Sequence, residues 1–134
     1  MKFFEIAEDE ILNIPEIDGQ HIAFIDKVNS LYNLLATNNN EEIIRLLDEL
    51  TTLSALHFKT EEDAMKKHSF EHFFSHKLEH DRFQGKLIAY STKVKEGKER
   101  LHLLFLQSLK RWFSNHIVLN DKKMSIYLLH KMND

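Results

Sequence analysis

Four stretches of this chain space their apolar residues alternately three and four positions apart, as along one face of an α-helix. Residues that cap or interrupt helices separate the stretches, at positions 37–40, around 68–69 and at 96–97. Short connections of this kind favour antiparallel neighbours. The sequence therefore predicts an all-α fold, an antiparallel up-down-up-down four-helix bundle.

The two ends of the chain lie outside these stretches. Residues 1–18 carry scattered apolar side chains and are interrupted by Pro15 and Gly19, so we expect an arm that packs over the outside of the helices. The bundle itself is expected over about residues 19–121, with a short tail at 122–134. With 134 residues, 43% of them apolar, the chain is long enough to bury one core, and we expect a single domain over 1–134.

Histidines occupy core positions in all four stretches. His21 lies near the start of the first, His57 near the end of the second, His76 and His80 near the start of the third, and His116 near the end of the fourth. Because consecutive helices alternate in direction, these positions meet at the same end of the bundle. The five imidazoles are therefore expected to share one layer.

Two carboxylates are candidates for the same layer. Glu61 follows His57 by four residues, about 40° further round a helix, and can point into the same space. Asp121 follows His116 by five residues, roughly 140° round a regular α-helix, which would aim it away. We therefore predict a π-type turn or a local break between His116 and Asp121.

A metal would explain why so many polar groups are buried together. A single histidine on a helix face is usually structural, but burying five imidazoles and two carboxylates without partners costs roughly 1–3 kcal/mol for each group. That sum approaches the stability of a whole domain. The chain has no cysteine, so the ligands must be nitrogen and oxygen. Glu62 and the histidines at 68, 72, 102 and 130 are expected to be solvated or structural.

Charge and hydropathy exclude several classes of partner. A net charge of −3 with interspersed signs provides no basic surface for nucleic acid. The N-terminus becomes acidic at positions 8–10, before any long apolar stretch, and no later segment is long enough to span a bilayer. We expect a cytoplasmic protein with neither a nucleic-acid nor a membrane partner.

Taken together, four segments resemble the hemerythrin family, and most closely its bacterial single-domain members: Asp18-Gly19-Gln20-His21, His57 to Glu62, His76-Lys77-Leu78-Glu79-His80, and His116 to Asp121. The resemblance implies two iron ions, one held by His76, His80 and His116 and the other by His21 and His57. Glu61, Asp121 and a solvent-derived oxo or hydroxo group would bridge them. It also implies an apolar oxygen pocket beside the iron with fewer histidines, lined by Phe24, Phe58, Trp112 and Leu119.

The number of ligands suggests how such a site would act. Two octahedral ions need about twelve ligand positions, of which the histidines, the bridging carboxylates and a bridging solvent group leave one open. We therefore predict a protein that binds dioxygen reversibly and is not an enzyme. Ferritin-like oxidases need two Glu-x-x-His motifs, whereas this chain has that form only at Glu99-Arg100-Leu101-His102.

Three other functions stay open at this stage. The same open position would suit a di-iron peroxidase or a nitric oxide scavenger, or an oxygen or redox sensor that acts through a partner. A helical interaction module without metal is the third. The sequence does not identify an electron donor.

Overall fold

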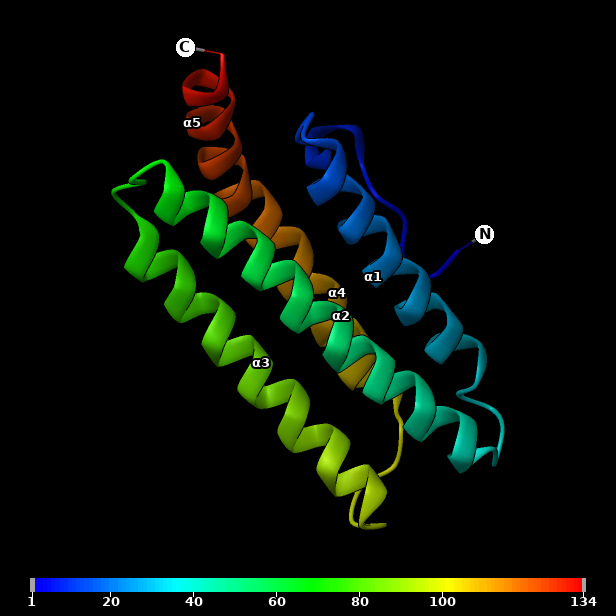
Figure 1. The fold of residues 1–134 in the computed structure, drawn as a ribbon. Helices are drawn as coiled ribbons and strands as arrows, with labels where there is room; N and C mark the ends of the chain where they lie inside the picture. Colours follow the sequence, from blue (N-terminus) through cyan, green and yellow to red (C-terminus); the bar gives the residue numbers. More distant parts are fainter. Residues whose placement is uncertain (1, 134) are drawn as a thin grey trace.

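The computed structural model describes residues 2–133, and these residues form helices without a β-strand. The helices form rods that run alternately up and down, as Figure 1 shows. The first three are α1 (Pro15–Asn33), α2 (Asn40–Lys67) and α3 (Phe73–Lys95), and the fourth begins with α4 (Leu103–His116). The predicted antiparallel four-helix bundle is confirmed. None of the helices in this part of the chain is both long and apolar enough to cross a membrane.

The first helix starts earlier than the sequence predicted. Pro15 is the first residue of α1, and the helix continues through Gly19 without a break. Proline is tolerated in the first helical turn because its missing N–H would have no partner there. Packing of Ile17 and His21 against the core outweighs the roughly 1 kcal/mol that a glycine costs inside a helix. The arm therefore ends at about residue 14 instead of 18.

The predicted C-terminal tail is instead a helix. After α4, a five-residue π-helical turn, η2 (Ile117–Asp121), leads directly into α5 (Lys122–Met132), so the fourth rod extends well beyond residue 121. Met124 and Leu128 of α5 are buried in the core. Residue 134, the last of the predicted tail, lies outside the described residues.

The N-terminal arm is anchored across α1 and α4, as expected of a segment that covers the bundle. Phe4 is 1% exposed and meets the ring of Phe113 edge to face at 5.8 Å. The Asn29 side chain accepts a hydrogen bond from the backbone N–H of Phe4 and donates one to its carbonyl. The Asp18 carboxylate accepts from the backbone N–H groups of residues 12 and 13.

The helices do not pack equally closely around the bundle. α1 packs along α2, α2 along α3, and α1 along α4, whereas backbone contacts between α3 and α4 are sparse. Away from the histidine layer, the core is aliphatic, and Val28, Leu31, Leu47, Leu50 and Leu106 are fully buried there. Histidines replace these aliphatic side chains towards the other end of the same seam.

We predict that Phe4→Ala destabilises the protein by about 3 kcal/mol, near the lower end for a buried phenylalanine because the arm can also detach locally. The measurement is the free energy of unfolding in urea. Phe74→Ala is the matched control, because Phe74 is 83% exposed and should change stability by no more than about 0.5 kcal/mol. Equal stabilities for the two variants would contradict the docked arm.

Candidate metal centre

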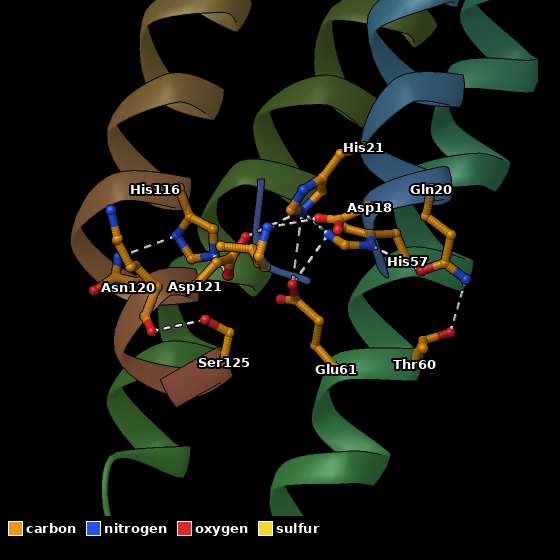
Figure 2. Close-up of polar contacts among 12 residues, drawn as sticks. Asp18, Gln20, His21, His57, Thr60, Glu61, His116, Asn120, Asp121 and Ser125 are labelled. Atoms are coloured by element: carbon orange, nitrogen blue, oxygen red, sulfur yellow. Dashed lines mark hydrogen bonds and ion pairs between the residues drawn. The ribbon is translucent and has the colours of Figure 1, made fainter. Parts of the chain in front are cut away.

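The structure brings all seven predicted ligand residues into one buried layer. They come from α1, α2, α3 and the fourth rod: His21, His57, Glu61, His76, His80, His116 and Asp121. All seven are buried, and the two carboxylates are completely so. In Figure 2, the side chains of His21, His57, Glu61, His116 and Asp121 converge on one point. The sequence thus predicted which side chains gather in this layer.

Glu61 divides its two oxygens between two groups of histidines. Its Oε1 atom lies 3.2 Å from Nε2 of His76 and 3.0 Å from Nε2 of His80. Its Oε2 atom lies 3.3 Å from Nε2 of His57 and 3.8 Å from Nε2 of His21. One carboxylate therefore faces both groups, as a bridging ligand would.

The two carboxylate oxygens of Asp121 likewise face different groups of histidines. Its Oδ1 atom lies 3.0 Å from Nε2 of His76 and 3.1 Å from Nε2 of His116. Its Oδ2 atom lies 3.2 Å from Nε2 of His21. The donors thus form two overlapping sets, one with three histidines and one with two, and both sets include Glu61 and Asp121.

The π-helical turn allows Asp121 to reach the site. The backbone N–H of Lys122 donates to the carbonyl of Ile117, five residues earlier, instead of to a residue four earlier. This wider turn absorbs one extra residue, so that the five-residue step from His116 to Asp121 ends on the inner face. The predicted π-type turn is confirmed.

Burial and ion pairing together determine the protonation of the cluster in the absence of a metal. Burial alone would lower the pKa of His21, but hydrogen bonds and charge from Asp121 and Glu61 outweigh it and raise that pKa to about 9. The same balance raises the pKa of His76 to about 9. Burial opposes ionisation of Glu61, yet the neighbouring imidazoles hold its pKa well below the usual value. Protons on the imidazoles thus balance the buried carboxylates.

Even with protons on the imidazoles, some buried carboxylate oxygens lack a hydrogen-bond partner. Oε2 of Glu61 and both carboxylate oxygens of Asp121 lack a hydrogen bond of good geometry, although histidine nitrogens lie nearby. The Nε2 atoms of His21 and His57 are only 3.1 Å apart, as are those of His80 and His116. Lone pairs that converge on a common point are what a metal ion requires. The imidazole and carboxylate donors fit iron, manganese or zinc.

Gln20, Asn120 and Glu62 contact the Nδ1 atoms of three of the histidine rings. Nδ1 of His57 donates to Oε1 of Gln20 at 2.9 Å, and Gln20 in turn donates to the Thr60 hydroxyl, as Figure 2 shows. The Asn120 amide lies 3.1 Å from Nδ1 of His116. Such outer contacts fix the orientation of a ligating imidazole.

Glu62 is the third of these side chains, and the expectation that it is solvated is wrong. Nδ1 of His80 donates to its Oε2 atom at 2.8 Å, and the Glu62 side chain is mostly buried. Glu62 belongs to α2 and His80 to α3, so the contact depends on how closely the two helices pack. The residue spacing contains no signal for it. A carboxylate in this position also makes the imidazole a stronger donor to a metal.

Two of the four predicted pocket residues, expected beside the two-histidine set, stack on histidines of the three-histidine set, although Phe58 also meets the His57 ring at 5.7 Å. The Phe58 ring stacks on His80 with centroids 4.0 Å apart, and Trp112 stacks on His116 at 4.6 Å. Leu119 is a correction: 61% of it is exposed, because the π-helical turn directs it outwards while Asp121 points in. Leu119 therefore does not line an enclosed pocket.

The apolar wall beside the two-histidine set contains a residue that the sequence analysis did not select. Phe113 meets the His21 ring edge to face at 5.2 Å and stacks on Phe24 at 4.3 Å. Phe113 belongs to a second stripe of helical spacing in α4, made of residues 106, 109, 113 and 116. Its spacing is a signal in the sequence from which Phe113 could have been predicted. Ile117, in the π-helical turn, is also buried.

The remaining histidines lie outside the cluster. His68 and His72 are in the connection between α2 and α3, where the His68 carbonyl accepts from the Tyr127 hydroxyl and His72 pairs with Glu71. His102 caps α4, since its Nδ1 accepts from the backbone N–H of Phe105. His130 lies on α5.

The comparison with known proteins decides the family. A model described as the hemerythrin HHE cation binding domain matches residues 12–125. The chain belongs to the hemerythrin family. It is 34% identical over 110 residues to the bacteriohemerythrin of Methylococcus capsulatus, and the aligned residues make up 82% of this chain and 84% of that protein. A hemerythrin-like protein of Naegleria gruberi is 32% identical over 108 residues, covering 81% and 79%.

Solved structures agree with this assignment. A crystal structure of wild-type hemerythrin matches with a TM-score of 0.89 at 31% identity, covering 94% of this chain and 98% of that one. A mutant hemerythrin structure matches with a TM-score of 0.91 at 32% identity, covering 96% and 98%. The chain is thus similar to bacteriohemerythrins in both sequence and fold, and the family's cation-binding description agrees with the buried donor cluster.

We predict that metal loading near pH 7.5 releases at least about two protons per chain, because His21 and His76 are protonated below pH 9 in the metal-free fold and must be neutral to bind a metal. Apparent metal affinity should therefore rise with pH up to about 9. A weakly buffered titration with an indicator dye and ferrous or zinc ion measures the release.

Stability of the metal-free protein should show the opposite trend. A histidine pKa raised from 6.5 to about 9 on folding contributes stability below pH 6.5 that is lost as the pH rises through 9. The urea midpoint of the metal-free protein should fall over this range. A pH-independent affinity with no proton release would contradict the charge balance described above.

Proposed function

We propose that this protein binds dioxygen reversibly at a pair of iron ions held by the seven buried ligands. The main support is the placement of the carboxylate oxygens of Glu61 and Asp121. Each carboxylate directs one oxygen to the three-histidine set and the other to the two-histidine set. A pair of ferrous ions would supply the two electrons that dioxygen takes up on binding. Membership in the hemerythrin family also supports iron as the metal.

The unequal donor sets support one vacant position. Three histidines and two carboxylates offer five donors at one side of the layer, and two histidines with the same carboxylates offer four at the other. Six-coordinate ions would need solvent to complete both sets, and the set with fewer protein ligands retains the site for a small molecule. Dioxygen would therefore enter beside His21 and His57.

The surroundings of that position are apolar. Phe113 and Phe24 are stacked and buried against the His21 side, and Ile117 lies buried in the turn that follows His116. An apolar wall withholds the proton donors that would turn reversible binding into an irreversible reaction. This property favours a carrier over a di-iron peroxidase.

The orientation of the imidazoles supports the same function. Gln20, Glu62 and Asn120 contact Nδ1 of His57, His80 and His116, so that Nε2 of each ring points inwards. Fixed rings keep the geometry of the site similar with and without a bound gas molecule.

The test is repeated exposure of the iron-loaded protein to oxygen and argon while its visible spectrum is recorded. We expect an absorption change that oxygen produces and argon reverses over several cycles. His21→Gln should abolish the reversible change, because it removes one of only two histidines from the vacant side. His102→Gln is the matched control, since His102 lies at the start of α4 and should leave cycling intact.

Irreversible bleaching in the first cycle would contradict reversible binding and support the peroxidase or scavenger. A chain that retains no iron would overturn the proposal. Reversible cycling in His21→Gln would show that the vacant position is not beside the two-histidine set.

A further inference from the structure

A groove runs along the side of the bundle where backbone contacts between α3 and α4 are sparse and aromatic side chains of the two helices stack on each other. It encloses about 370 Å³, a volume within the range of small-molecule sites. Its walls are α3 residues from 79 to 87 and α4 residues from 105 to 112. The groove lies outside the ligand cluster, and the function proposed above does not use it.

The floor of the groove is aromatic and adjoins the ligand layer. Trp112 is partly exposed in the groove, with its ring stacked on Phe83 at 4.1 Å and on the ligand residue His116 at 4.6 Å. Phe105 lies in the same wall, about two helical turns earlier. Phe83 and His116 cover the faces of Trp112, and Tyr90 stacks on Phe105 at 3.6 Å, so a flat ring would pack against the edges of these side chains.

The rim of the groove carries positive charge without a partner. Arg82 and Lys86 are exposed, four residues apart on α3, and neither makes an ion pair with another residue of the described chain. By contrast, Lys77 and Lys95 of the same helix pair with Asp81 and Asp48. Glu79 also lines the groove, so the three groups leave one net positive charge.

We propose that the groove binds a planar aromatic anion of the flavin-nucleotide class. Its ring would lie against Trp112 and Phe105, and its phosphate would be bound by Arg82 and Lys86, since arginine and lysine are the usual partners of phosphate. A ring held there would be separated from His116 by a single aromatic side chain. That is the position of an electron donor for the metal centre, so the biological role, though not the binding, depends on the proposed function.

The test is a titration of the metal-loaded protein with flavin mononucleotide, observing flavin fluorescence and the emission of Trp112, the one tryptophan of the chain. Saturable quenching of both signals is expected. Arg82→Gln and Lys86→Gln should each weaken binding about tenfold, the loss of one charge-assisted contact. Lys93→Gln is the matched control, because it removes the same charge from an exposed position of α3 away from the groove.

Two further arms separate the ring from the phosphate. Riboflavin, which lacks the phosphate, should bind about tenfold more weakly than flavin mononucleotide. Inorganic phosphate alone should not displace the flavin at millimolar concentration. Ser108→Phe, which fills the groove from α4, should abolish binding while leaving the helical circular dichroism unchanged.

An absence of quenching at millimolar flavin, or equal affinities for Arg82→Gln, Lys93→Gln and the unmodified protein, would overturn the proposal. Equal affinities for riboflavin and flavin mononucleotide would overturn the role of the two cations. Oxygen cycling of the same samples without flavin keeps the two proposals apart: a protein that cycles oxygen but binds no flavin contradicts only the groove.

Discussion

Two carboxylates completely buried among imidazoles are the constraint on which this structure depends. A carboxylate in an apolar core costs several kcal/mol unless a positive charge balances it, and here the balance must come from protons on the histidines or from metal ions. The two carboxylates raise the pKa of His21 and His76 to about 9, so these imidazoles carry protons when no metal is bound. Even so, carboxylate oxygens are left without good hydrogen bonds. Metal ions would satisfy the same atoms, which links metal binding to stability.

The helical framework follows from the need to place these groups in one layer. Alternating helix direction brings together residues from the starts of α1 and α3 and from the end of α4, while α2 and α3 supply pairs of polar residues four positions apart. The π-helical turn is the local irregularity that the layer requires, because Asp121 reaches it only through the wider turn. The other end of the seam is filled with aliphatic side chains and needs no such adjustment.

The regular spacing of apolar residues along the sequence made most of the fold and of the ligand layer predictable. The four rods, the common layer and the turn before Asp121 follow from helical geometry and connection lengths. The start of α1 and the helix at 122–132 were missed because Pro15 and the end of the seam look like boundaries, whereas packing of Ile17, Met124 and Leu128 extends the helices. The roles of Glu62 and Phe113 depend on contacts between helices, and the outward direction of Leu119 depends on the π-helical turn itself.

The most direct test of the central claim is crystallographic anomalous diffraction at the iron absorption edge on the iron-loaded protein. The account predicts two peaks between Glu61 and Asp121, one next to the nitrogens of His76, His80 and His116 and the other next to those of His21 and His57. Each carboxylate should contribute one oxygen to each ion. A single peak, or iron bound elsewhere while the carboxylates keep their protonated imidazole partners, would contradict it.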